Sequence, residues 1–256
     1  MTIESINFGY ALPAIAAKPS HAAAFERIAS ISNSLSSREL RKSKVIVDQN
    51  DLPSCVSCAL SAAMEVLNFD WPQLAPLFHY YVTRHERGGA DSQGFLFLPD
   101  SLNTLNKVGI CTQKLHPQPF DEAGSRTKPS SEAYADALQR AFGRSGETRR
   151  FRASQGLSRA NWIREQLRQE HPVIIGFQQP VGYYRSFLNS RFEWLTPDVP
   201  LNPFGHCVFV CGYDDLRQAL RIQDCHGDNY FDSGYWWMGY RIADSNIVQE
   251  AYCLIR

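Results

Sequence analysis

Residues 48–65 read DQNDLPSCVSCALSAAME and contain the strongest structural signal in the chain. Pro53 ends an extended segment, and Ser54 stands where the N-cap of a helix is expected. The run that follows is rich in Ala, Leu and Met at helical spacing, which predicts a helix over residues 55–69. Cys55 would then lie in the first turn, where the helix dipole and unpaired backbone N–H groups favour a thiolate. Cys55 is therefore a candidate nucleophile.

A cysteine nucleophile needs a base, and the chain has seven histidines, at positions 21, 79, 85, 116, 171, 206 and 226. His206 begins the apolar run HCVFVCGY, a predicted strand that would hold its imidazole on a rigid element. The next predicted strand, ALRIQDC, contains Asp224, and adjacent antiparallel strands would place it beside His206. From the residues alone, Cys55, His206 and Asp224 are one of many possible triples in 256 residues.

Helical patterns dominate the first two thirds of the chain, and short β-branched or aromatic runs dominate the last third. Further helices are predicted over residues 21–42, 71–84, 100–107, 134–142 and 159–169. Residues 116–130, rich in Pro, Gly and Ser, are predicted to be a loop. Strands are predicted for PVIIGF, HCVFVCGY, ALRIQDC, GYWWMGY and EAYCLIR. Trp236 and Trp237 alternate across one of these strands, so at most one faces a cleft. The order of elements predicts an α+β fold in two lobes.

Residues 48–65 resemble the active-site helix of papain-like cysteine peptidases (the C1 family), above all in its bacterial form. Gln49 stands six residues before Cys55, as the oxyanion-hole glutamine does in that family. Three later segments are similar in the same order: GHCVFVCGYDD at 205–215, RIQDCHG at 221–227 and DSGYWWMGY at 232–240. The resemblance covers about residues 38–256.

The resemblance implies a papain-like fold, with a helical N-terminal lobe that carries the nucleophile helix and an antiparallel β-sheet in the C-terminal lobe. Residues 1–37 would form an N-terminal segment and residues 38–256 the peptidase domain. The first segment is shorter than the inhibitory pro-segment of lysosomal members, so control of that kind is not expected.

The same resemblance assigns roles to individual residues. Cys55 would be the nucleophile, His206 its general base and acid, and Asp224 the group that orients His206. Gln49 and the backbone N–H of Cys55 would form the oxyanion hole. Residues 91–94 would border the pocket for the substrate side chain next to the scissile bond.

The sequence departs from the family at three consecutive positions. Asp224 aligns with the family's asparagine, and its charge should raise the pKa of the His206 imidazolium more than a neutral amide would. Cys225 and His226 replace a Ser-Trp pair whose tryptophan shields the histidine–asparagine contact from water. His226 is interpreted here as a surface residue, with a second titrating group near the site as the alternative.

The predicted function is hydrolysis of peptide or isopeptide bonds by a thiol peptidase. Aspartate also orients the histidine in cysteine-dependent acyltransferases, transglutaminases and deamidases, so acyl transfer to, or glutamine deamidation of, a protein is an alternative. The altered Asn-Ser-Trp stretch motivates a third hypothesis, a catalytically silent papain-fold binding module.

The remaining thiols indicate no other chemistry. Cys55 and Cys58 form a Cys-x-x-Cys, but no thioredoxin-like strand–helix alternation surrounds it, and Cys58 is expected to be a small packed residue. A zinc site from Cys55, Cys58, His206 and Cys207 has enough ligands, but Cys207 would point to the opposite face of its strand. No metal and no cofactor is predicted.

The amino-acid composition limits the classes of binding partner that are expected. Lys plus Arg and Asp plus Glu each number 26, so the zero net charge predicts neither a nucleic acid nor a membrane as partner. A protein or peptide substrate is expected, and the oligomeric state stays open. The N-terminus lacks the features of a secretory signal, and the seven scattered cysteines are expected to be reduced. Synthesis in the cytoplasm is therefore expected, with signal-peptide-independent secretion as an alternative.

Overall fold

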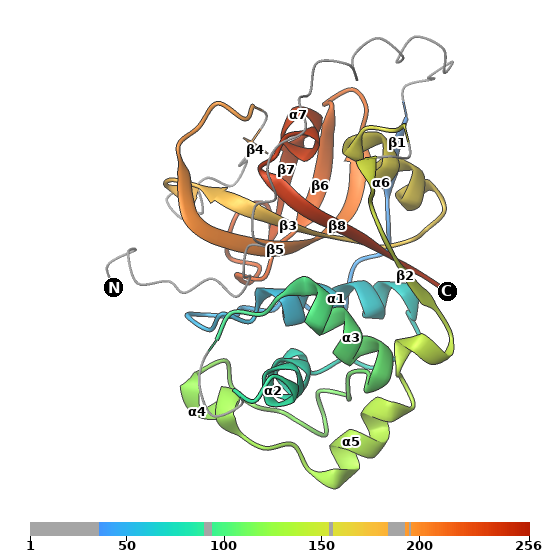
Figure 1. Cartoon of the computed structure of the whole chain (residues 1–256), viewed down its shortest axis with the longest axis vertical. Helices are drawn as coiled ribbons and strands as arrows, with labels where there is room; N and C mark the ends of the chain where they lie inside the picture. The colour runs from blue at the N-terminus through green and yellow to red at the C-terminus, as the bar shows by residue number, and fades with distance from the viewer. Residues whose placement is uncertain (1–35, 90–93, 154–155, 184–192, 195) are drawn as a thin grey trace.

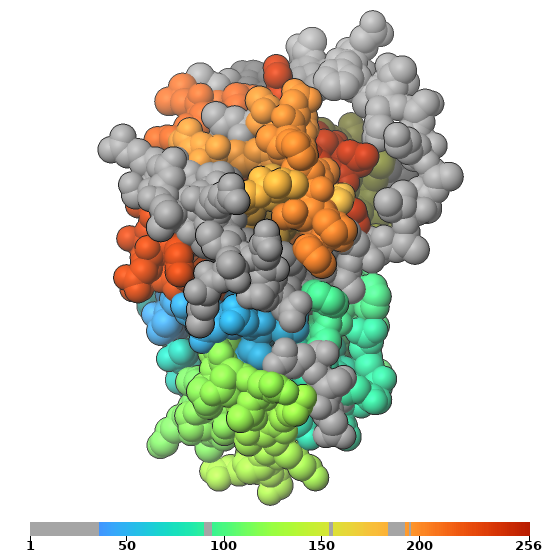
Figure 2. All heavy atoms as spheres, turned by 90° about the vertical axis from the view of Figure 1, so that its left-hand side faces the viewer, coloured from blue at the N-terminus to red at the C-terminus, as the bar shows by residue number. Residues whose placement is uncertain are grey.

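The computed structural model describes residues 36–89, 94–153, 156–183, 193–194 and 196–256. These residues form a helical lobe and a lobe built on a β-sheet (Figure 1), so the predicted α+β class is confirmed. Figure 2 shows a blue segment from the early part of the described chain between the green helical lobe and the orange and red sheet lobe. Within the described ranges, no helix is both long and apolar enough to cross a membrane.

The helical lobe lies in the lower half of Figure 1. It contains α1 (Cys55–Leu67), α2 (Pro76–Glu86), α3 (Leu98–Lys107), α4 (Glu122–Arg126), α5 (Ser131–Leu138) and the 3₁₀ turn η2 (Phe142–Arg144). The helix predicted over residues 71–84 begins only at Pro76, because proline is favoured in the first turn and has no N–H to donate. α4 interrupts the predicted loop 116–130, because Asp121 caps it by accepting a hydrogen bond from the Gly124 N–H (2.7 Å).

The sheet has the strand order β2-β8-β3-β5-β6-β7-β4, with β1 paired to β5. The strands are β1 (Ser37–Glu39), β2 (Glu147–Arg150), β3 (Val173–Pro180), β4 (Glu193–Trp194), β5 (Leu201–Asp214), β6 (Ala219–Gln223), β7 (Tyr235–Gly239) and β8 (Val248–Ile255). The described pairs are antiparallel, as predicted, except for the short parallel pair of β4 with β7. Two helices belong to this lobe, α6 (Arg159–Arg168) and α7 (Tyr240–Asp244).

β1 adds a strand to the end of β5. Because residues 37–39 pair with residues 212–214, the helix predicted over residues 21–42 is wrong there, and residues 1–35 lie outside the described residues. The pairing requires Gly212, where a Cβ atom would lie 2.6 Å from the carbonyl oxygen of Arg38. β1 also spans the predicted boundary between residues 1–37 and 38–256.

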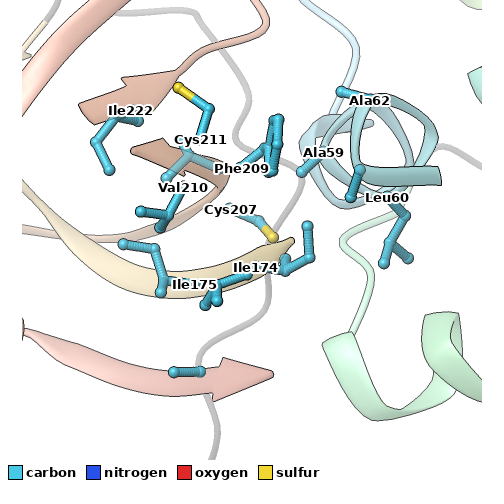
Figure 3. Packing of buried hydrophobic residues seen from close by; sticks show 14 of the residues in the cluster. Ala59, Leu60, Ala62, Ile174, Ile175, Cys207, Phe209, Val210, Cys211 and Ile222 are labelled. Carbon is cyan, nitrogen blue, oxygen red and sulfur yellow. The ribbon is translucent and has the colours of Figure 1, made fainter. Parts of the chain in front are cut away.

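The helix that carries Cys55 lies at the boundary between the lobes and packs against the sheet (Figure 1). Ala59 and Leu60 of α1 share one hydrophobic cluster with Ile174 of β3 and with Cys207 and Phe209 of β5, shown from close by in Figure 3. Small alanine side chains let the helix approach the strands closely. This packing sets the N-terminus of α1 against β5, where His206 lies.

Candidate active site

The N-terminus of α1 places Cys55 in the first helical turn, as the sequence predicts. Ser54 is the N-cap, but its side chain makes no capping hydrogen bond. Its hydroxyl oxygen instead lies 3.7 Å from the sulfur of Cys58, one turn further along the helix. The thiols of Cys55 and Cys58 are both buried, and Cys58 is a small packed residue as expected.

His206 and Asp224 form a buried pair on neighbouring strands. β5 and β6 are antiparallel with Phe209 opposite Gln223, so the ends of the two strands bring His206 and Asp224 together. The Nε2 atom of His206 lies 2.9 Å from Asp224 Oδ1. This contact leaves Nδ1 as the ring nitrogen available to Cys55.

The ring of His206 interacts with both charges that flank it. Burial disfavours the imidazolium, but the negative charges of Asp224 and Cys55 outweigh burial and raise the pKa of His206 to about 10. His206 is therefore protonated at neutral pH. The structure thus brings together Cys55, His206 and Asp224, which the sequence singled out.

Asp224 receives hydrogen bonds on both of its carboxylate oxygens. Oδ1 accepts from the backbone N–H of Cys225 (2.8 Å) in addition to His206, and Oδ2 accepts from the Tyr183 hydroxyl and from Trp236 Nε1 (2.8 Å). Burial alone would raise the pKa of Asp224, but the charge of His206 and these hydrogen bonds hold it below its ordinary value. Asp224 therefore remains a carboxylate.

His226 is buried beside this pair, so its interpretation as a surface residue is wrong. Its ring stacks on that of His206, with the centroids 5.4 Å apart and the planes inclined by 22°. Its Nε2 atom lies 3.7 Å from Asp224 Oδ1. Burial lowers the pKa of His226 to about 4, so the ring is neutral at pH 7. His226 thus covers the His206–Asp224 contact with an uncharged aromatic surface.

Gln49 is held next to the site by backbone pairing with the segment that follows Asp224. The Gln49 N–H donates to the Cys225 carbonyl (2.8 Å), and the Gly227 N–H donates to the Val47 carbonyl (3.0 Å). The Gln49 side chain accepts a hydrogen bond at Oε1 from the Cys225 thiol (2.9 Å). Its Nε2 is buried and has no hydrogen-bond partner among the described residues. A buried amide donor without a partner is costly in a folded protein and is typical of a binding position.

Two partners of Asp224 were not assigned from the sequence. Trp236 is the tryptophan of its strand that turns to the site, which the alternation allowed but did not specify. Tyr183 follows β3 in a segment with no recognisable motif, and no signal in the sequence identifies it. Of the predicted pocket border, residues 91–93 lie outside the described residues, and Gly94 contacts the Tyr80 hydroxyl through its N–H and its carbonyl.

The seven cysteines are all free and buried. Among the described residues, the side chains whose ligand atoms gather as they would around a metal ion are His206, Asp224, Cys225 and His226. This group shares only His206 with the four-residue zinc site weighed from the sequence.

The strand order, the helix bearing Cys55 and the His206–Asp224 pair define a papain-like fold, and comparison with solved structures supports this. Xylellain, a cysteine protease from Xylella fastidiosa, matches with a TM-score of 0.74 and 22% identity, over 98% of this chain and 96% of that one. Digestive procathepsin L 3 of Tenebrio molitor matches with a TM-score of 0.63 and 14% identity, over 99% and 75%. The Carica candamarcensis cysteine protease CMS1MS2, solved in complex with E-64, matches with a TM-score of 0.57 and 18% identity, over 86% and 98%.

These matches confirm, at the level of the fold, the resemblance to papain-like cysteine peptidases, and xylellain fits the similarity to their bacterial form. The sequence itself matches no protein-family model and no curated protein.

Proposed function

We propose that the chain is a thiol peptidase in which Cys55 attacks the carbonyl carbon of a peptide or isopeptide bond. The observation that carries the proposal is the position of His206, between Cys55 and the Asp224 carboxylate, on a papain-like fold. A positive imidazolium beside the first turn of a helix attracts negative charge on the cysteine sulfur.

The reaction has two steps. The Cys55 sulfur bonds to the carbonyl carbon, and His206 gives its proton to the departing amine, so that a thioester and a free amine form. Water then attacks the thioester while His206 takes its proton, which releases the acid and restores Cys55. In both steps the oxyanion accepts hydrogen bonds from Gln49 Nε2, which has no other described partner, and from the N–H of Cys55.

The charge on Cys55 determines when His206 gives its proton to the leaving amine. Part of the rise in the pKa of His206 comes from the Cys55 charge. When the sulfur becomes a thioester, this charge disappears, and the imidazolium becomes a stronger acid at the moment when the amine needs a proton. The Asp224 carboxylate stays in place throughout and keeps the ring oriented.

The segment that motivated a silent binding module supports a working site instead. Cys225 contacts the Gln49 amide and His226 covers His206, so these two replacements preserve the contacts around the pair. No described residue gives acyl transfer or deamidation a separate argument, so hydrolysis remains the proposed reaction.

The experiment that tests the proposal is labelling with E-64, the compound present in the CMS1MS2 structure. Intact mass and peptide mapping should find one molecule of E-64 on Cys55, with loss of peptide hydrolysis in parallel. Cys55→Ala should remove both signals, while Cys58→Ala, one turn along the same helix, should keep them. An adduct that persists in Cys55→Ala would refute Cys55 as the nucleophile. Ammonia release or amine incorporation without chain cleavage would refute hydrolysis of peptide or isopeptide bonds as the reaction.

A further inference from the structure

Four different side chains converge on one point behind the His206 ring. His206, Asp224, Cys225 and His226 each offer one ligand atom, and these four atoms all lie within 4.8 Å of one another. His206 comes from β5, and the other three are consecutive residues that follow β6. All four side chains are buried.

The spacing is close to what a tetrahedral zinc ion requires. Zn–N and Zn–O bonds of ~2.0–2.2 Å and Zn–S bonds of ~2.3 Å place neighbouring ligand atoms roughly 3.3–3.7 Å apart. His206 Nε2 and Asp224 Oδ1 are 2.9 Å apart, and His226 Nε2 is 3.7 Å from the same oxygen. To hold the ion, the distance between His206 Nε2 and Asp224 Oδ1 would increase by about 0.4 Å, and the largest distance among the four ligand atoms would decrease by about 1 Å. The His206 and His226 rings, now stacked with planes inclined by 22°, would also have to turn so that both ring planes pass through the ion.

Neighbouring groups already orient these ligands. Tyr183 and Trp236 donate to Asp224 Oδ2 and leave Oδ1 directed at the cluster. Gln49 Oε1 accepts from the Cys225 thiol, and the Gln49 N–H holds the Cys225 carbonyl. Hydrogen bonds of this kind fix ligand orientation in metal sites and strongly affect affinity. The cluster is therefore organised before any ion arrives.

The donor set selects the metal. One thiolate, two imidazoles and one carboxylate suit Zn²⁺, whereas Mg²⁺ prefers six oxygen ligands. Four protein ligands also fill every position of a tetrahedral ion and leave none for water, unlike catalytic zinc sites, which keep one position open. An ion bound here would block chemistry rather than perform it.

We propose that His206, Asp224, Cys225 and His226 form a binding site for Zn²⁺ that inhibits the enzyme. On binding, Cys225 releases its thiol proton and His206 releases its Nε2 proton, both to solvent, and the ion takes the place of the proton between His206 Nε2 and Asp224. His206 then keeps a proton on Nδ1 only and, with its Nε2 lone pair on the ion, cannot form the imidazolium that protonates the leaving amine. The inhibitory effect rests on the proposed peptidase function, whereas the binding site itself does not.

The test measures zinc directly on the full chain, without substrate. Metal-free protein is dialysed against ZnCl₂, the bound metal is determined by elemental analysis, and the dissociation constant is obtained by competition with a chromophoric chelator. We expect one Zn²⁺ per chain and no Mg²⁺. Cys225→Ser and His226→Gln should each weaken zinc binding by at least about 10-fold. Even the loss of a residue that only hydrogen-bonds to a ligand typically lowers metal affinity by 10–100-fold. Cys58→Ser and Cys207→Ser, matched buried thiols beside the site, should bind zinc as the parent does.

Cobalt gives a second measurement that does not depend on variants of the ligands. Co²⁺ bound to the parent protein should show sulfur-to-metal charge-transfer absorption, and this absorption should persist in Cys55→Ser. Absence of metal binding would overturn the proposal. Loss of the absorption in Cys55→Ser would also overturn it, because the ion would then sit on the nucleophile.

Zinc should also slow the labelling of the parent protein by E-64. The Cys225→Ser variant, if it reacts with E-64 in the absence of zinc, should react at the same rate in its presence. Zinc binding without any labelling of Cys55 would keep the metal site and reject the peptidase.

Discussion

His79 makes the helical lobe sensitive to acid. It lies on α2, fully buried, with Nδ1 2.9 Å from the Ser57 hydroxyl on α1 and Nε2 3.0 Å from the Ser101 carbonyl on α3. A carbonyl only accepts, so Nε2 carries the hydrogen and Nδ1 accepts from Ser57. The neutral ring therefore joins three helices, one of which carries Cys55. Burial disfavours its charged form and lowers the pKa of His79 to about 4 from an ordinary value of 6.5.

The effect on stability follows from that difference in pKa. A histidine whose folded-state pKa is depressed contributes stability above pH 6.5, and loses it as the pH falls towards 4. The difference between the ordinary pKa of 6.5 and the folded-state pKa of about 4 corresponds to ~3.4 kcal/mol once both states are fully protonated. Between pH 7 and pH 4 the native state should lose about 3 kcal/mol through this residue, with a slope approaching 1.4 kcal/mol per pH unit.

Urea denaturation at several pH values, followed by circular dichroism, measures this loss. His79→Gln does not titrate, and its amide can still donate to the Ser101 carbonyl. We expect the variant to be less stable than the parent at pH 7 and the gap to shrink by about 3 kcal/mol by pH 4. Taking the difference removes the contribution of His226, whose pKa is also lowered to about 4. A gap that does not change with pH would refute the argument.

Three further predictions concern the active site and the sheet. Gln49→Ala should lower kcat by ~10²-fold, because an oxyanion donor is removed; steady-state peptide hydrolysis measures this, and an unchanged kcat would contradict it. Asp224→Asn should cost ~2 kcal/mol in urea denaturation, because the new amide nitrogen cannot accept from the Trp236 N–H. In the Asp224→Asn variant, Trp236→Phe should lower the free energy of unfolding by less than it does in the parent. Equal losses in the two backgrounds would contradict this coupling. Gly212→Ala should cost ~1–3 kcal/mol in urea denaturation, because its Cβ would lie 2.6 Å from the Arg38 carbonyl oxygen, whereas Gly94→Ala, with open space around it, is the control.

The parts of the site that were predicted correctly depend on local sequence. Pro53 and Ser54 mark a helix start that places Cys55 in the first turn, and the structure begins α1 at that residue. The apolar run that follows His206 and the run that precedes Asp224 form adjacent strands, because their Val, Phe and Ile side chains fit a buried sheet. Short-range rules were sufficient for these elements, and the resemblance supplied their order.

The missed features depend on contacts between residues far apart in the chain. Tyr183 reaches Asp224 across 41 positions, and Cys225 reaches Gln49 across 176. Neither pair leaves a periodic pattern or a motif in the sequence. His226 was interpreted as a surface residue that replaces the family's tryptophan. Its burial follows from the pairing of residues 47–49 with 225–227, which only the folded chain reveals.

The three departures from the papain-like pattern act together. A buried carboxylate at position 224 needs several donors, and Tyr183 and Trp236 provide them on the oxygen opposite His206. An asparagine at that position would turn its amide nitrogen towards two donors, so the charge at position 224 and the donors around it depend on each other. Cys225 ties the same segment to Gln49, and the neutral ring of His226 covers the contact that a tryptophan covers in the family. The three replacements thus preserve an oriented histidine, and they add the ligands through which we propose that a metal ion controls it.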